Sequence, residues 1–268
     1  MNHLRRSPVS FMLLSIIVLL LAACQPQTSP ATQQPADAPP KPAATETPVP
    51  AVVATEDPNA ISKDILLDPA LATDADSAKI NHYLYEGLVT LDASGNVQPG
   101  IAESWIISDD TLAYTFTIRA NATFSDGAPI TPDDIVANVN RWLDPKSPLR
   151  GNGSYAAWQE VFAGFLGEKD GDGRPISPVD GIQKVEFNTV ILHLNRPVPE
   201  LLTYLANPAF VVLNANALEA GDYGKITSKV ISSGPYVVSS WTSDGLILSP
   251  NPTYWGEIPQ GNLEFSFR

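Results

Sequence analysis

Three aspartates lie close together in the stretch FSDGAPITPDDIVANVNRW, residues 124–142: Asp126, Asp133 and Asp134. Carboxylates at such spacing could ligate a divalent cation, or could share general acid and base work. The same residue types also mark turns and helix starts. Which account holds depends on the turn and helix signals around them.

The neighbouring residues predict a turn followed by a helix start. The Asp-Gly pair at 126–127 is typical of a tight turn. Thr131 is expected to cap a helix, and Pro132 suits the first helical position. Asp133 and Asp134 then fall in the first turn, where the helix dipole favours negative charge. The aspartates are therefore predicted to shape the chain locally rather than to perform chemistry.

A second acidic stretch, EKDGDG at residues 168–173, resembles the start of a calcium-binding loop. It offers Glu168, Asp170 and Asp172 as alternating oxygen ligands, with a glycine in the sixth place. The twelfth place is Val179, where such a loop requires a bidentate glutamate. The stretch is therefore predicted to be a solvated turn, and no metal site is expected.

Motifs that carry catalysis are missing from the sequence. It contains no HExxH, GxSxG, CxxC or phosphate-cradling glycine loop, and only 3 histidines and 1 cysteine. The histidines stand apart from one another, at positions 3, 82 and 193. We therefore predict no enzymatic activity and no cofactor.

The N-terminus has the features of an export signal. Arg5 and Arg6 precede an apolar run at residues 11–21, which is too short to span a bilayer comfortably. The sequence LAAC that ends at Cys24 resembles the lipobox of bacterial lipoproteins, in which the cysteine is lipidated after cleavage. Residues 1–23 are thus predicted to be a lipoprotein signal peptide. The alternative is an ordinary secretory signal with a chance cysteine.

Composition changes twice after the signal. Residues 24–58 are rich in Pro, Ala and Thr and nearly free of large apolar side chains, which predicts a disordered tether. Residues 59–268 contain enough apolar residues for a core and are predicted to fold. The location expected is the cell envelope, on the periplasmic or extracellular face, with a lipid anchor in the membrane.

Charge narrows the possible partners. The formal net charge is −13 at pH 7, from 29 acidic and 16 basic residues. Such a surface repels phosphate backbones, so nucleic acid is not expected as a partner. The charge also suits the solubility of an exported protein, and this plainer account stays open.

Periodicity predicts mixed secondary structure in the folded part. A helix capped by Ser77 is expected over residues 77–88, and a strand with alternating apolar residues over 111–119. Strand pairs are expected around residues 188–189 and 243–245, and a turn at 93–96. Because no regular βαβ rhythm appears, the fold class is α+β, with mixed, largely antiparallel sheets and flanking helices. Further short helices are predicted at residues 199–206 and 214–220.

Four motifs in order resemble one protein family. They are LDPALATDADSAKINHYLYEGLVTLDASGNVQPGIAESW, YTFTIRANATFSDGAPITPDDIVANVNRW, SGPYVVSSW and NPTYWG, which together extend from residue 67 to residue 256. In order and spacing they resemble the family 5 extracellular solute-binding proteins of ABC transporters, the dipeptide-, oligopeptide- and nickel-binding group. The resemblance implies a receptor that binds a small-molecule or peptide ligand between two lobes. It would deliver that ligand, for which a peptide is the leading expectation, to ABC permease subunits.

The resemblance also implies that this chain is the first lobe of a two-lobed, type II-like binding protein. The final residues LEFSFR alternate as a strand that stops in mid-pattern, which fits a chain whose second lobe is missing. A fragment of this kind is expected to bind its ligand poorly. An alternative function is a sensory or scaffolding lipoprotein that uses the same lobe without a transporter.

Candidate ligand-binding residues come from the resemblance alone. Relatives approach the ligand backbone with the loop after the LDP motif, which corresponds here to Thr73, Asp74 and Ala75. Relatives also place aromatic residues near the cleft in the segment that contains Tyr155 and Trp158. The alternatives are an ordinary capping loop for the first three and core packing for the two aromatic residues.

Overall fold

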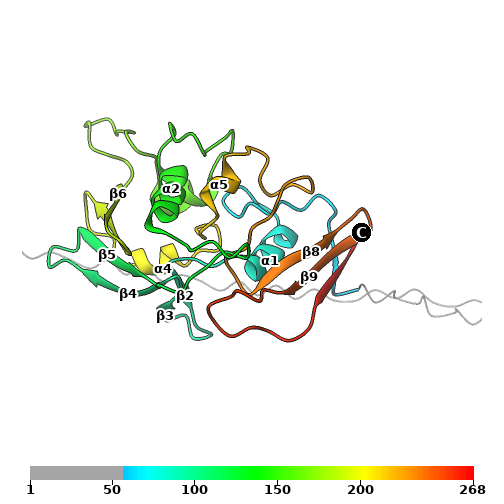
Figure 1. Ribbon diagram of the computed structural model, residues 1–268. Helices are drawn as coiled ribbons and strands as arrows, with labels where there is room; N and C mark the ends of the chain where they lie inside the picture. The colour runs from blue at the N-terminus through cyan, green and yellow to red at the C-terminus, as the bar shows by residue number, and fades with distance from the viewer. Residues whose placement is uncertain (1–56) are drawn as a thin grey trace, which may run out of the picture. The chain divides into compact units, whose positions relative to one another are not determined.

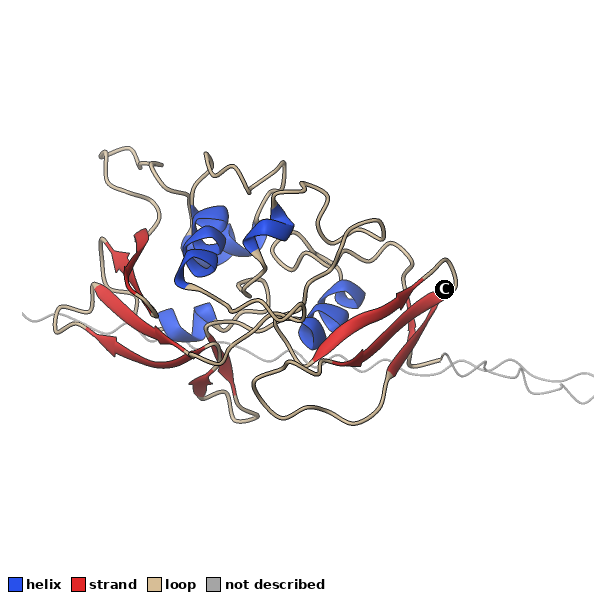
Figure 2. Ribbon diagram, viewed as in Figure 1, coloured by secondary structure: helices blue, strands red, loops and turns tan. Residues whose placement is uncertain are grey.

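The computed structural model describes residues 57–268 (Figure 1). The predicted signal peptide at 1–23, Cys24 and nearly all of the predicted tether at 24–58 lie outside the described residues. Within 57–268 the elements are short strands and helices in mixed order, as Figure 2 shows. The α+β prediction is confirmed.

The first four-stranded sheet is antiparallel throughout. Its order is β4 (Ala102–Ile107), β5 (Ala113–Ile118), β7 (Thr189–Leu194) and β6 (Val179–Glu186). Strand β5 alternates as predicted, because Tyr114, Phe116 and Ile118 are buried on one face. Pairing sets Phe116 opposite Val190 of β7, so apolar side chains from both strands point to the same core.

Helix α2 (Pro132–Leu143) covers this sheet and packs against β6 and β7. Its start is the predicted one. Thr131 accepts a hydrogen bond from the backbone N–H of Asp134, and the Asp134 carboxylate accepts one from the backbone N–H of Thr131. Ile135, Val139 and Trp142 recur along the buried face of the helix, as their spacing indicates.

The second four-stranded sheet has the order β1 (Ala60–Ile61), β10 (Leu263–Phe267), β9 (Gly245–Pro250) and β8 (Tyr236–Trp241). The predicted β8–β9 hairpin is present, and the predicted strand at the end of the chain is β10. Strand β1 pairs with β10 in parallel, which joins the two ends of the described chain. Helix α1 (Ala75–Leu84) packs on this sheet through contacts with β8.

Smaller elements connect the two sheets. Strands β2 (Val89–Leu91) and β3 (Val97–Pro99) form a hairpin around the predicted turn at 93–96. The two predicted short helices are present in shorter form. The remaining helices are α3 (Ala156–Phe162), α4 (Leu201–Leu205) and α5 (Ala215–Leu218).

Three predicted boundaries are wrong. Helix α1 ends at Leu84 rather than at residue 88, because Tyr85 is extended, with φ −135° and ψ 152°. Helix α1 begins at Ala75 rather than Ser77, because the Asp74 carboxylate accepts the backbone N–H of Ser77 at 2.8 Å and so caps the helix. The Ser77 hydroxyl instead turns inward and accepts the N–H of Leu66 at 2.8 Å. The strand expected from residue 111 begins at Ala113, since Thr111 has φ 59° and belongs to the preceding turn.

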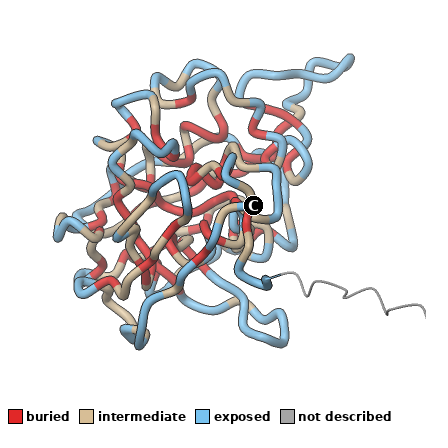
Figure 3. Tube along the Cα trace, turned by 90° about the vertical axis from the view of Figure 1, so that its right-hand side faces the viewer, coloured by how far each residue is buried: buried red, intermediate tan, exposed pale blue. Residues whose placement is uncertain are grey.

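Buried side chains gather in two apolar clusters, and Figure 3 shows the buried segments in red inside the protein. One cluster lies between the first sheet and helices α2 and α3, and includes Phe116, Trp142 and Trp158. The other lies between the second sheet and α1, and includes Ile61 and Leu84. Among residues 57–268, no helix combines the length and apolar character that crossing a membrane requires.

Candidate functional site

The predicted ligand-contacting loop is an exposed, extended segment ahead of α1. Thr73, Asp74 and Ala75 are all exposed, and Asp74 has φ −108° and ψ 155°. Within residues 57–268, the backbone N–H and C=O of Thr73 make no hydrogen bond. The loop therefore presents unpaired main-chain groups to solvent while Asp74 caps the helix behind it. Its contact with a ligand stays a prediction.

A buried ion pair fixes the beginning of this loop. Asp68 and Arg141, which are 2% and 3% exposed, form a two-pronged contact in which both guanidinium Nη atoms donate to the carboxylate oxygens. The carbonyl of Asp68 then accepts the N–H groups of Leu71 and Ala72, which closes a tight turn. Arg141 also donates from Nε to the carbonyl of Leu149 at 2.9 Å. The loop is thus tied to helix α2.

Two buried tyrosines form a hydrogen-bonded pair next to the start of the same loop. The hydroxyl of Tyr85 donates to the carbonyl of Leu67 at 2.8 Å, and the hydroxyl of Tyr223 donates to the carbonyl of Ile231 at 3.1 Å. The two hydroxyl oxygens lie 3.1 Å apart. Burial raises the pKa of both tyrosines well above the ordinary value, because the anionic form would lose its hydration. They act as neutral hydrogen-bonding struts at any physiological pH.

Tyr155 and Trp158 are core residues, each 1% exposed. The hydroxyl of Tyr155 donates to the carbonyl of Arg150 at 2.7 Å, and burial raises the pKa of Tyr155 to about 12. The indole of Trp158 donates to the carbonyl of Gly164 at 3.1 Å and stacks near Phe162 at 4.3 Å between ring centroids. This is the packing arrangement that the sequence left open. Ligand contact by either side chain stays a prediction.

The two predicted segments nevertheless meet in space. A Cβ atom added to Gly153 would lie 2.0 Å from a methyl carbon of Leu71, so the loop after Asp68 and the segment before Tyr155 are in direct contact. Together with residues 218–225 they surround a cavity of about 410 Å³. Leu71 lines this cavity, whereas Thr73 and Tyr155 do not. A larger residue at 153 would require the Leu71 side chain to move.

Sequence reasoning missed the buried charges at this site. Arg141 lines the cavity with Asp68 and Arg150, and all three are more than nine-tenths buried. The sequence carries little signal for Arg141, because at helical spacing it lies away from the stripe of Ile135, Val139 and Trp142, and yet it is buried. A buried charged residue needs a buried partner.

The acidic residues at 168–173 and at the start of α2 have local structural roles. In the stretch at 168–173, Asp170 accepts the backbone N–H groups of Asp172 and Arg174 at 2.9 Å, which makes it a turn. Among residues 57–268, no group of three or more His, Cys, Asp or Glu side chains is arranged to hold a metal ion. Asp133 pairs with Lys184 at the surface, and Asp134 completes the helix cap.

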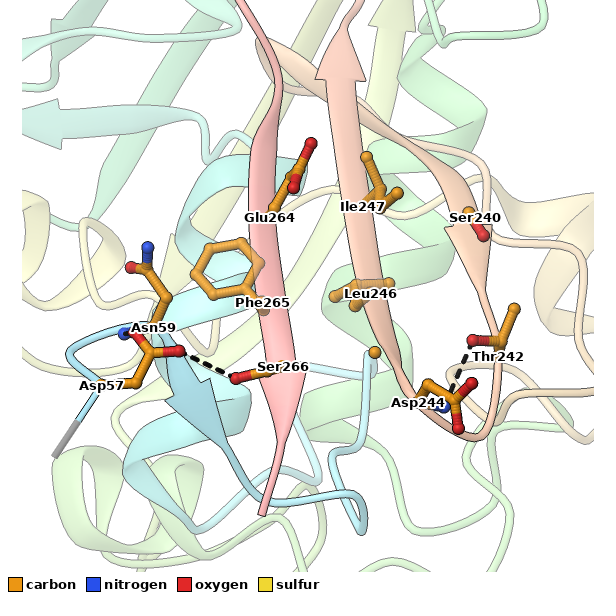
Figure 4. A pocket seen from close by; sticks show the side chains of 11 residues that line it. Asp57, Asn59, Ser240, Thr242, Asp244, Leu246, Ile247, Glu264, Phe265 and Ser266 are labelled. Carbon is orange, nitrogen blue, oxygen red and sulfur yellow. Dashed lines mark hydrogen bonds between the residues drawn. The ribbon is translucent and has the colours of Figure 1, made fainter.

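A larger cavity, of about 470 Å³, lies elsewhere on the second sheet. Figure 4 shows its lining side chains, which come from β8, β9, β10 and the segment around Asp57. The carboxylates of Asp57, Asp244 and Glu264 line it, and Asp57 accepts a hydrogen bond from Ser266 at 3.0 Å. The cavity has no lining residue in the segments 66–75 and 148–158, whereas the cavity of about 410 Å³ is lined by residues from both. We therefore place the candidate site at the loop after Asp68.

Residues 57–268 form an α+β unit of two four-stranded sheets with flanking helices. The family model described as "Bacterial extracellular solute-binding proteins, family 5 Middle" matches residues 96–264, more than half of the chain. The chain belongs to this family of solute-binding proteins, whose members are transport proteins rather than enzymes.

Individual relatives agree with this membership. The periplasmic murein peptide-binding protein MppA of Escherichia coli K12 is 32% identical over 193 residues, which cover 70% of this chain and 34% of MppA. The probable deoxycholate-binding periplasmic protein YgiS of the same organism is 32% identical over 192 residues, 70% of this chain and 35% of YgiS. The solved structure of HbpA2 from Haemophilus parasuis superposes with a TM-score of 0.66 at 27% identity, covering 78% of this chain and 42% of HbpA2.

The chain spans about a third of the length of the two curated relatives. The solved structure of the periplasmic murein tripeptide-binding protein MppA superposes with a TM-score of 0.61 at 28% identity, covering 75% of this chain and 39% of MppA, in agreement with an α+β lobe of that architecture.

Proposed function

We propose that this chain is the first lobe of a lipid-anchored extracellular receptor that binds peptides and delivers them to an ABC importer. Family membership supports the solute-binding role. Binding would occur by closure of a second lobe over the loop at residues 73–75, without chemistry on the ligand. The cell-envelope location follows from the predicted signal and from the periplasmic relatives.

The observation that supports a peptide ligand is the free main chain of Thr73. Its N–H and C=O are exposed and unpaired, and the ion pair between Asp68 and Arg141 fixes the loop that bears them. An extended peptide can pair its own backbone with such groups, as strands do when they add to an open edge. Deoxycholate, which is named for YgiS, has no peptide backbone to offer. A peptide, as named for MppA, fits this edge better.

The test requires a two-lobed form, made by joining residues 57–268 to the part of MppA that follows the matched region. Calorimetry with tripeptides and with deoxycholate should give heat only with the peptides. Thr73→Pro removes one N–H donor and should weaken peptide binding by about 1 kcal/mol or more, whereas Thr73→Ser keeps the donor and should not. Peptide binding that is unchanged in a normally melting Thr73→Pro variant, or binding of deoxycholate alone, would contradict the proposal.

A comparison of the two-lobed form with residues 59–268 alone tests the role of the second lobe. A ligand held between two lobes loses the contacts of one lobe when residues 59–268 are used alone. Affinity for tripeptides should therefore fall by several kcal/mol, which turns micromolar binding into binding too weak to measure. Micromolar heats from residues 59–268 alone would place the ligand site wholly within this lobe.

Anchoring is tested separately through Cys24. Cys24→Ser should release the exported protein into the soluble fraction, because acyl chains on that thiol would supply the membrane affinity. The matched control is Thr28→Ser, which changes a nearby residue of the predicted tether and leaves the cysteine in place. Membrane association that persists in Cys24→Ser would contradict the lipid anchor and leave the solute-binding proposal intact.

A further inference from the structure

The cavity of about 410 Å³ beside the loop at 69–76 contains an unusual cation. Arg150 lines it and is 8% exposed. Among residues 57–268, no carboxylate lies within ion-pairing distance of its guanidinium. Burial lowers the pKa of Arg150, because the cation loses part of its hydration.

The contacts of Arg150 leave one edge of its guanidinium free. Nη1 donates to the carbonyls of Arg141 and Trp142, at 3.0 and 2.7 Å, near the end of α2. The planar group lies 4.0 Å from the ring centroid of Tyr155 and 4.2 Å from that of Phe165. In residues 57–268, neither Nε nor Nη2 has a hydrogen-bond partner, and neither is among the unpartnered atoms sealed from solvent.

Nε and Nη2 form the side edge of a guanidinium, where two parallel N–H groups match the two oxygens of a carboxylate. The rings and the two carbonyls hold this edge in place. A fixed donor pair of this kind loses little side-chain freedom on binding.

The charge of the cavity contrasts with that of the protein. Arg141, Arg150 and Lys225 line it against the carboxylates of Asp68 and Glu219, so it has an excess of positive charge. Four other cavities in residues 57–268 each have an excess of carboxylates. On a chain with a net charge of −13, a positive cavity marks a place where an anion is favoured.

We propose that this cavity is a subsite for a carboxylate group of the bound ligand, and that the free guanidinium edge of Arg150 binds it. The inference rests on the proposed function, since it assigns one part of the ligand to one part of the candidate site. Leu71 lines the cavity and Thr73 follows two residues later, so a ligand that pairs with the main chain at 73 can reach Arg150 with an acidic side chain or a terminal carboxylate.

The test measures Arg150 directly and does not need transport or a second lobe. The Cys24→Ser chain is labelled with ¹³C and ¹⁵N, and the Nε–Hε resonance of Arg150 is assigned through its connection to the backbone of residue 150. Titration with sodium propionate should shift this resonance saturably. Propionamide, which has the same shape without the charge, and sodium chloride at matched ionic strength should not. Arg150→Lys should weaken propionate binding about tenfold, because the side edge of the fork is lost.

Two further variants keep the test decisive if Arg150→Lys does not fold. Lys225→Gln removes an exposed cation of the same cavity and should weaken propionate binding about two- to threefold. Arg174→Gln, at an exposed ion pair elsewhere, should leave it unchanged. The resonance of Arg150 could instead not respond, or respond equally to sodium chloride. Arg150 would then serve only to bind the carbonyls at the end of α2. That result would overturn the subsite and leave the peptide proposal standing.

Discussion

The two four-stranded sheets of residues 57–268 are assembled over very different distances along the chain. All strands of the first sheet lie between Ala102 and Leu194, and two of its three pairings join strands that are consecutive in sequence. The second sheet also has two such pairings, β8–β9 and β9–β10, but its edge pairs Ala60 with Ser266. The first sheet is local, and the second is closed by the two ends of the described chain.

This difference implies different demands on the sequence. A hairpin needs only alternation and a turn, whereas an edge that joins distant segments must offset a larger loop-closure entropy through its contacts. Ile61 and Arg268 supply such contacts, because Ile61 is fully buried and the N–H of Arg268 donates to its carbonyl at 3.0 Å. The ion pair between Asp68 and Arg141 then fastens the loop beside the second sheet to the helix above the first.

Breaking that ion pair should have the largest effect. Asp68→Asn leaves the Arg141 charge buried without its partner, and should lower the free energy of unfolding by about 3–5 kcal/mol. Urea unfolding of the Cys24→Ser background measures it. The matched control is Asp172→Asn, which removes one partner of an exposed pair and should cost less than about 1 kcal/mol.

A double variant sharpens the same point. Asp68→Leu combined with Arg141→Met removes both charges and should recover much of the lost stability. The loop would then lose its two-pronged attachment while the protein stays folded. If Asp68→Asn costs no more than Asp172→Asn, the pair does not fasten the two regions together.

The long-range edge gives the second prediction. Ile61→Ala should destabilise the protein by about 2–4 kcal/mol, because it opens a cavity where β1 meets β10. Ile106→Ala, at a 72% exposed position on an edge strand of the local sheet, should cost less than about 1 kcal/mol. Urea midpoints at equal slope give the comparison. Equal losses would mean that the edge formed by β1 contributes little to the second sheet.

The same contrast explains how far the fold could be predicted. The strand through Tyr114 and Phe116, the β8–β9 hairpin and the helix start at Thr131 depend on neighbours in sequence, and all were predicted. Strand β1 contains only Ala60 and Ile61, too few residues for any periodicity. Its existence depends on a partner some two hundred residues away. The start of α1 was misplaced because Asp74 and Ser77 are both good caps, and tertiary contacts with Leu66 decided between them.

The residues of the candidate site also differ in whether the sequence could predict them. The loop at Thr73 was named as a candidate because it directly follows the LDP motif at residues 67–69. Arg141 and Arg150 were not, because their roles depend on Asp68 and on carbonyls that folding brings near them. A buried charge becomes visible only when its surroundings are known.

The smallest expected effects are at the two adjacent aspartates at the start of α2, the helix that covers the first sheet. Their substitution tests whether these carboxylates serve only the local structure of the helix. Asp134 accepts hydrogen bonds from the backbone and hydroxyl of Thr131 at 3.0 and 2.6 Å, and one from the N–H of Ala215 at 3.2 Å. Asp134→Asn should therefore cost about 1 kcal/mol, similar to Thr131→Ala. Asp133→Asn removes only a surface pair with Lys184 and should stay within about 0.5 kcal/mol of the wild type. Peptide binding by the two-lobed form should be the same in all three variants. Loss of binding in Asp134→Asn with an unchanged melting curve would show that this carboxylate serves the ligand site rather than the helix.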